Sequence, residues 1–141
     1  MIRAFNNKEI EEIMKIWLDS NIEAHDFINE SYWTKNYNSV KSKILIAEVY
    51  VYETNGDIYG FVGLIDNYIA GVFVKKDMRR KGIGKQLIDF LKENHNELYL
   101  EVYRKNEEAI KFYLREGFRI IESSIDNETN EEELTLKWKN K

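Results

Sequence analysis

The stretch VFVKKDMRRKGIGKQLIDFL, residues 72–91, decides how the chain folds. It begins as an apolar strand and ends in a segment where Ile83, Leu87 and Phe90 keep the spacing of one helix face. Between these two parts, residues 75–85 hold six cations and one acid. The whole chain has a net charge of −4, so the rest of it carries −9. An acidic protein therefore concentrates positive charge where a strand gives way to a helix.

Positive charge is unfavourable at the start of a helix, because the helix dipole places about half a positive charge there. Four cations nevertheless crowd this end: Arg79, Arg80, Lys81 and Lys85. A bound anion explains the arrangement, if free backbone N–H groups hold it and Gly82 and Gly84 let the backbone approach closely. The alternative is a solvated basic turn whose glycines only satisfy backbone geometry. The spacing matches neither a Walker A loop nor the G-x-G-x-x-G dinucleotide pattern.

Length and composition narrow the classes of protein. We expect the 141 residues to form a single domain, residues 1–141. The chain has no Cys, which excludes disulfides and a Cys nucleophile, and His25 and His95 lack metal-ligand spacing, so no metal is expected. No apolar run reaches the length of a signal peptide or membrane span, so we expect a cytoplasmic protein without a membrane partner. Net acidity argues against nucleic acid as the main partner.

Hydrophobic periodicity predicts alternating strands and helices. Strands are expected at residues 1–5, 43–53, 58–66, 67–74, 98–103, 118–125 and 132–139. Helices are expected at residues 10–18, around residues 33–43, from Gly82 onward, and between Asn106 and Gly117. The strands near residues 72 and 98 flank a helix, which indicates one parallel crossover in a mostly antiparallel sheet. The fold class is therefore mixed α/β (α+β), with helices on both faces of the sheet.

Two motifs resemble the GNAT N-acetyltransferase superfamily. Residues 79–84, RRKGIG, fit its [RQ]-x-x-G-x-[GA] signature, which also follows a strand and starts a helix. Residues 100–118, LEVYRKNEEAIKFYLREGF, are similar to its L-x-V-x(3)-N-x(2)-A-x(2)-[FL]-Y-x(3)-G-F segment. The order of elements agrees over nearly the whole chain, and the connection AHDFI…SYW looks like that of a branch of small bacterial acetyltransferases. The resemblance implies the GNAT type of sheet, with splayed strands at an acetyl-CoA site.

The resemblance implies that the anion is the pyrophosphate of acetyl-CoA. The cofactor-binding turn would then consist of Arg79, Arg80, Lys81, Gly82, Ile83, Gly84 and Lys85. The pantetheine arm would pair with the strand residues Val72, Phe73 and Val74. Asn106 matches an Asn that the family often places near the pantetheine, although its position alone favours a helix N-cap.

Tyr113 is the candidate catalytic acid. It lies seven residues after Asn106, about two helical turns on, so both share a helix face. In many members of the family this Tyr protonates the departing CoA thiolate, and the resemblance implies the same role here. The alternative is an ordinary core Tyr in an amphipathic helix.

The amine acceptor must lose a proton before it attacks, and Glu101 is the first candidate for the base. It precedes Tyr113 by twelve residues, a spacing that resembles the pair in the protein N-terminal acetylating branch. Because partial burial raises the pKa of a carboxyl and so suits a base, we expect Glu101 to be partly buried. The alternatives are an ordinary charge on a solvated strand face and a base reached through water.

His25 is the second candidate for the base, because a histidine titrates near neutral pH. It lies in the connection that borders the acceptor site in this fold, where a His that caps a helix is equally compatible. Phe27, Tyr32 and Trp33 lie in the same connection, as an apolar wall for the acceptor or as packing.

These observations predict an acetyl-CoA-dependent N-acetyltransferase in which an amine attacks the bound thioester directly. Small-molecule amines and peptide amines fit equally as the acceptor. Residues 122–133 hold six acids and no cation, which predicts a solvated hairpin or a surface that attracts a cationic amine. The competing class is a non-catalytic acyl-CoA-binding or regulatory module, and a phosphate or nucleic-acid binder comes third. A homodimer through the last strands is an open alternative to a monomer.

Overall fold

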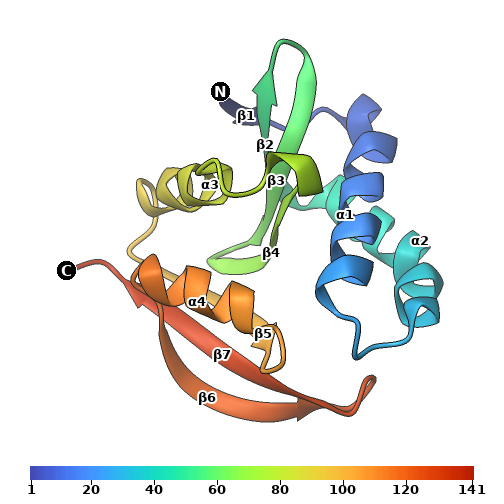
Figure 1. Ribbon diagram of the computed structural model, residues 1–141. Coiled ribbons are helices and arrows are strands. Elements are labelled where there is room, and N and C mark those ends of the chain that lie inside the picture. Colours follow the sequence, from blue (N-terminus) through green and yellow to red (C-terminus); the bar gives the residue numbers. More distant parts are fainter.

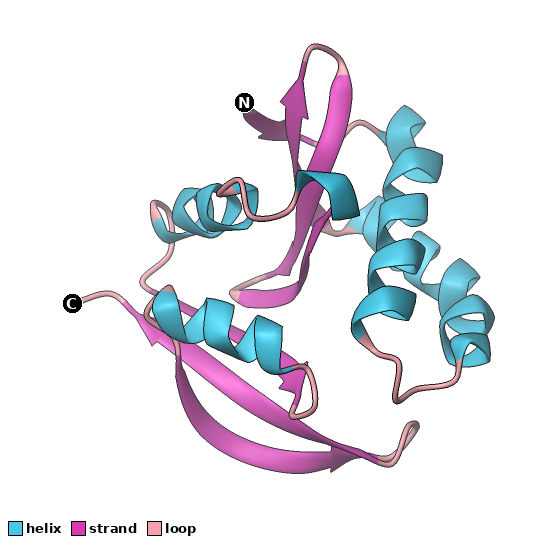
Figure 2. Cartoon of the chain, in the orientation of Figure 1, coloured by secondary structure: helices cyan, strands magenta, loops and turns pink.

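A computed structural model describes residues 1–141 as one seven-stranded sheet with four α-helices (Figures 1 and 2). The strands are β1 Ile2–Ala4, β2 Glu48–Thr54, β3 Asp57–Ile65, β4 Tyr68–Val74, β5 Glu97–Tyr103, β6 Arg119–Asp126 and β7 Glu131–Lys139. The helices are α1 Ile10–Ala24, α2 Glu30–Ile46, α3 Ile83–Lys92 and α4 Glu107–Arg115, with 3₁₀ turns η1 Asn7–Glu9 and η2 Lys76–Met78. The expected mixed α/β class is confirmed.

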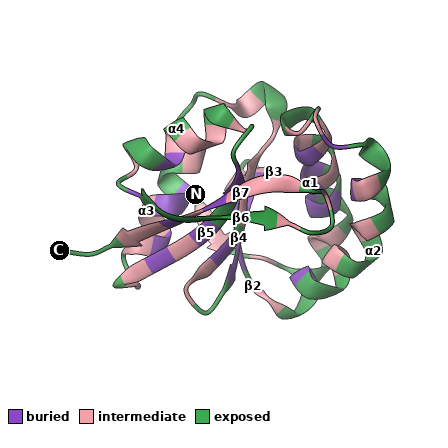
Figure 3. Cartoon of the chain, turned by 90° about the horizontal axis from the view of Figure 1, so that it is seen from below, coloured by how far each residue is buried: buried purple, intermediate pink, exposed green.

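The sheet has the order β1-β2-β3-β4-β5-β7-β6, and helices cover both of its faces. Residues of α3 and α4 pack on one face and residues of α1 and α2 on the other (Figure 1). Alternation along β5 divides the two cores: Leu98 and Leu100 point toward α3 and α4, and Tyr103 points toward α1 and α2. Figure 3 shows buried residues on α1 and along the central strands. No helix is both long and apolar enough to cross a membrane.

Local sequence signals set several of the boundaries. A capping box forms at the start of η1, where the Asn6 N–H donates to Glu9 at 3.0 Å and the Asn6 side chain accepts a backbone N–H. Asn55 and Gly56 both have positive φ, 53° and 86°, as the tight hairpin between β2 and β3 requires. Gly117 ends α4 with φ of 93°, in the left-handed conformation expected of a C′ residue.

One expected strand is wrong in its first part. Residues 43–46 lie in α2, which begins at Glu30 and runs through Ile46, while β2 starts only at Glu48. The apolar side chains of this region follow the helical period, because Trp33 and Ile44 are both buried and lie about three turns apart. Ile46 is 88% exposed, so the run KILI does not mark a buried strand.

The crossover between β4 and β5 creates an opening in the sheet. Along one edge, β4 pairs with β3 over its whole length. Along the other edge it pairs in parallel with β5 at one position only, Tyr68 opposite Tyr99, where the Tyr99 N–H also donates to the Asn67 carbonyl at 3.0 Å. The two strands diverge beyond this point, which confirms the expected splay. We call the divergence beside Val72–Val74 the β4–β5 opening.

Candidate active site

The turn before α3 presents backbone N–H groups rather than a capping side chain. Gly82 is the N-cap residue with φ of 80°, no side chain caps the helix, and its first turn holds no acid. Arg80 also has a positive φ, 64°, so the chain reverses sharply at this point. The first backbone hydrogen bond of α3 runs from Gln86 N–H to the Gly82 carbonyl. The amides of the first turn of α3 can therefore receive an anion.

Two of the cations that crowd this turn stabilise the protein itself. Arg79 donates from Nε to the Val74 carbonyl at 3.1 Å and from Nη1 to Glu23 of α1 at 2.6 Å. Lys85 lies 3.2 Å from Glu116, at the end of α4. Arg79 therefore holds the end of β4 near α1, and Lys85 holds α3 against the end of α4.

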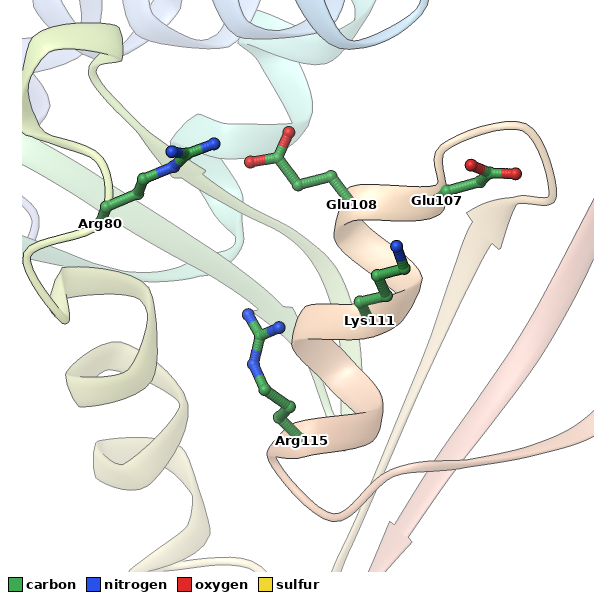
Figure 4. A pocket seen from close by; sticks show the side chains of 5 residues that line it. All are labelled: Arg80, Glu107, Glu108, Lys111 and Arg115. Atoms are coloured by element: carbon green, nitrogen blue, oxygen red, sulfur yellow. The ribbon is translucent and has the colours of Figure 1, made fainter.

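A third cation of the turn, Arg80, borders a cleft of about 630 Å³ between the turn and α4. Its wall consists of Arg80, Glu107, Glu108, Lys111 and Arg115 (Figure 4). In Figure 4 the side chain of Arg80 faces α4 across the cleft. Lys111 and Arg115 were not predicted as site residues, although their spacing of four along α4 places them on one helix face.

Tyr113 of α4 points into the hydrophobic core. It is only 8% exposed, and its ring centre lies 5.1 Å from that of Phe112 and 5.6 Å from that of Phe118. Burial alone raises the pKa of the Tyr113 hydroxyl well above its ordinary value, so the phenol stays protonated. A Cβ at Gly84 would come within 3.2 Å of the Phe112 ring, so α4 packs directly against the turn.

Asn106 connects α4 to the α1–α2 connection through His25. Its side-chain oxygen accepts the Ala109 N–H at 3.3 Å, which makes it the expected N-cap, and its Nδ2 lies 3.3 Å from His25 Nε2. His25 Nδ1 lies 3.0 Å from the Asn21 carbonyl, which can only accept. Neutral His25 therefore carries its proton on Nδ1 and accepts from Asn106 on Nε2. Burial lowers the pKa of His25, which favours this neutral form.

The α1–α2 connection packs its aromatic residues around His25. The His25 ring stacks on Trp33 at 5.1 Å, and Phe27 and Tyr103 meet it edge-on. The Tyr32 hydroxyl donates to Glu128, in the turn between β6 and β7, at 3.0 Å. The connection is thereby joined to the last hairpin, 96 residues away in sequence.

Glu101 lies on the face of β5 that is turned toward α1 and α2. The Tyr68 hydroxyl of β4 donates to its carboxylate at 3.0 Å, across the beginning of the β4–β5 opening. Contrary to the expectation of partial burial, Glu101 is exposed. Its carboxylate therefore lies beside the opening but is more accessible to solvent than the sequence analysis expected.

A second carboxyl, missed by the sequence-based interpretation, lies on the same face. Glu133 of β7 lies opposite Tyr103 of β5 and is half-buried. Its burial and the negative charges of Glu101 and Asp126 raise the pKa of the Glu133 carboxyl to about 7. The alternation of β7, with Leu134 buried, shows which way Glu133 points. The alternation along β7 marks Glu133 as a site residue only once the pairing of β5 with β7 is known.

Comparisons with known proteins agree with this geometry. Residues 46–120 match the model of the acetyltransferase (GNAT) domain family. The chain is 35% identical to the peptidyl-lysine N-acetyltransferase YiaC of Escherichia coli K12, over 98% of this chain and 96% of that protein. The solution structure of apo YjaB from Escherichia coli has a TM-score of 0.87 at 28% identity, covering 100% of this chain and 98% of that one.

A third similar structure carries a ligand. The PaiA N-acetyltransferase of Thermoplasma acidophilum, solved with coenzyme A, has a TM-score of 0.79 at 19% identity, covering 99% of this chain and 98% of that one. This likeness shows a shared fold. Together with the matched domain and the YiaC relative, it leads to one conclusion. The chain belongs to the GNAT family of acetyl-CoA-dependent N-acetyltransferases.

Proposed function

We propose that this enzyme transfers the acetyl group of acetyl-CoA to the side-chain amine of a lysine in a peptide or protein. The observation that carries the proposal is the β4–β5 opening, which has a cationic helix start at one side and carboxyl groups at the other. The first side suits a phosphate-bearing cofactor, and the second suits an ammonium group. The relative YiaC, named as a peptidyl-lysine N-acetyltransferase, supports a lysine acceptor.

The cofactor would lie along the turn and into the opening. The amides of residues 80–85 would bind the pyrophosphate, and Val72–Val74 would pair with the pantetheine arm through the free edge of β4. Arg80, Lys111 and Arg115 of the cleft would attract the remaining phosphate. Arg79 and Lys85 would act indirectly, since their ion pairs hold the turn in place.

The reaction requires an acid near the sulfur and a neutral amine near the thioester. Tyr113 would protonate the CoA thiolate as it leaves, because its phenol stays protonated and lies on the helix that packs against the turn. Glu101 would contact the acceptor ammonium beside the opening. Neutral His25 has both ring nitrogens in hydrogen bonds, so we propose that it positions Asn106 and the α1–α2 connection.

We also propose that the enzyme works in the cytoplasm and forms a homodimer through β6. A chain without Cys gains nothing from an oxidising compartment.

The dimer would form through β6. This strand lies at the edge of the sheet, and Ile120, Ile121 and Ile125 on it are 47%, 45% and 54% exposed. Sedimentation of the wild type and of Ile121→Lys tests the dimer, which predicts a smaller species for the variant. A wild type that sediments as a monomer contradicts it.

The release of free CoA from acetyl-CoA tests the proposed activity. The acceptors are a peptide with a blocked N-terminus and one lysine, the same peptide with that lysine replaced by glutamine, and a panel of small amines. We expect release only with the lysine peptide, and one added acetyl group on it by mass spectrometry. Release with small amines alone contradicts the peptide acceptor. Tight CoA binding without release from any amine supports the non-catalytic module.

A further inference from the structure

The carboxyl of Glu133 occupies a distinct place on the acceptor side of the opening. In the sheet it lies opposite Tyr103, and Glu101 lies two residues before Tyr103 on the same face of β5. Tyr68 of β4 reaches the same group of residues, since it hydrogen-bonds Glu101, and its pKa is raised by burial and by the charges of Glu101 and Glu133. Residues from β4, β5 and β7 thus converge where the two central strands separate.

Glu133 differs from the acids around it because its carboxylate has no hydrogen bond or ion pair. Its neighbours along β7 are paired: Glu131 with Lys105 at 3.1 Å and Glu132 with Arg104 at 3.4 Å. On the adjoining strands, Glu101 accepts from Tyr68 at 3.0 Å and Asp126 accepts from Tyr103 at 2.7 Å. A half-buried carboxylate without a partner costs stability, so its retention beside the active-site opening points to a use in the reaction.

The surroundings of Glu133 suit a proton acceptor. The groups that face it are Glu101 and Tyr103 of β5, Asp126 of β6 and Tyr68 of β4, and none of them is a cation. With a pKa raised to about 7, the carboxyl exchanges protons near neutral pH, where general bases work best. Glu101, in contrast, is exposed.

We propose that Glu133 is the catalytic base that removes a proton from the acceptor ammonium, while Glu101 holds that ammonium beside it. The inference rests on the proposed function, because it requires an amine acceptor in this place. The assignment gives the two carboxyls different tasks. Glu101 is held by its hydrogen bond from Tyr68, whereas the carboxyl of Glu133 has no partner and is free to gain and lose a proton.

The step balances without a further reactant. The ammonium gives one proton to the Glu133 carboxylate and becomes a neutral amine, whose lone pair forms the C–N bond to the thioester carbon. The C–S bond breaks, and the thiolate takes the Tyr113 proton. The Tyr113 oxygen recovers a proton from the former amine nitrogen through water. Glu133 then releases its proton to solvent, which is the one proton that the net reaction produces.

The test is the pH dependence of kcat/KM for a lysine peptide in the wild type and in Glu133→Gln, Glu133→Asp and Glu101→Gln. In the wild type kcat/KM should rise through a pKa near 7, separate from the titration of lysine near 10.4. In Glu133→Gln, kcat should fall about 10²-fold and the rise of kcat/KM near pH 7 should disappear, while the KM for acetyl-CoA stays unchanged. Glu133→Asp should keep the rise of kcat/KM near pH 7. Glu101→Gln should mainly raise the KM for the peptide.

Glu93→Gln is the matched control, since it removes the same charge from an exposed position at the end of α3. We expect its kcat to stay within about twofold of the wild type. An unchanged kcat and an unchanged pH dependence near 7 in Glu133→Gln, or an equal loss in Glu93→Gln, would overturn the inference while leaving the proposed function intact. A wild-type protein that acetylates no amine would overturn the proposed function, and the inference with it.

Discussion

The two sides of the β4–β5 opening are built in different ways. Most of the proposed cofactor side comes from one continuous segment, residues 72–85, which would act through backbone N–H groups and glycines. The acceptor side joins Glu101 of β5, Asp126 of β6 and Glu133 of β7 with the connection that holds His25. The first is positive and local in sequence, and the second is negative and assembled by the fold. The cofactor side can therefore be recognised from a short motif, whereas the acceptor side depends on how distant segments pack.

The largest expected effect concerns Tyr113, which we place at the boundary of the two sides. Tyr113→Phe removes the proton donor but keeps the buried ring. We expect a loss of about 10²-fold or more in kcat with unchanged affinity for acetyl-CoA. Steady-state kinetics and a CoA-binding titration measure the two quantities. Full turnover in the variant would remove Tyr113 from the acid role.

The next effect separates backbone strain from cofactor binding. Gly82 and Gly56 have similar positive φ, 80° and 86°, and a Cβ would meet no atom within 4 Å at either position. Alanine at each should cost about 1–2 kcal/mol of stability from left-handed strain. Only Gly82→Ala should also weaken acetyl-CoA binding, by about tenfold, because it distorts the anion-binding turn. Calorimetric titration compares the two variants, and equal affinities would contradict the backbone role of the turn.

A smaller effect is expected at Asn106, whose side chain has two tasks. Asn106→Ala should lower the free energy of unfolding by about 1 kcal/mol through loss of the N-cap. Asn106→Asp keeps a capping oxygen but replaces the donor to His25 Nε2 with a carboxylate. The pKa of His25 should therefore rise in Asn106→Asp, as followed by NMR titration. An unchanged His25 titration in that variant would show that the two side chains do not interact in solution.

The smallest effect is the pH dependence of stability. Burial and the nearby charges of Glu101 and Asp126 raise the pKa of Glu133 in the folded state to about 7, from an ordinary value of 4.5. The folded state thus binds more protons than the unfolded state between these values, and Glu133 makes stability fall as pH rises through this window. Glu133→Gln should therefore be more stable than the wild type at pH 8, by about 1 kcal/mol after solvent screening. Urea unfolding at pH 5 and pH 8 tests this, and equal differences at both pH values would contradict the raised pKa.

The same contrast explains what the sequence could reveal. The cap at Asn106 and the parallel crossover between β4 and β5 follow from local patterns, so they were predicted. Lys111 and Arg115 border the cleft only because α4 packs against the turn, and Glu133 meets Glu101 only because β7 lies between β5 and β6. These contacts depend on how helices and strands pack in the fold, which the spacing of hydrophobic residues along the chain does not determine.

Backbone hydrogen exchange with and without acetyl-CoA tests the placement of the cofactor most directly. We predict that acetyl-CoA slows exchange at residues 72–74 and 80–85, and leaves the amides of residues 131–133 unchanged. Subsequent addition of a lysine peptide should protect residues of the acceptor side instead. Protection by acetyl-CoA that falls on residues 131–133 and spares residues 80–85 would contradict the assignment of the two sides.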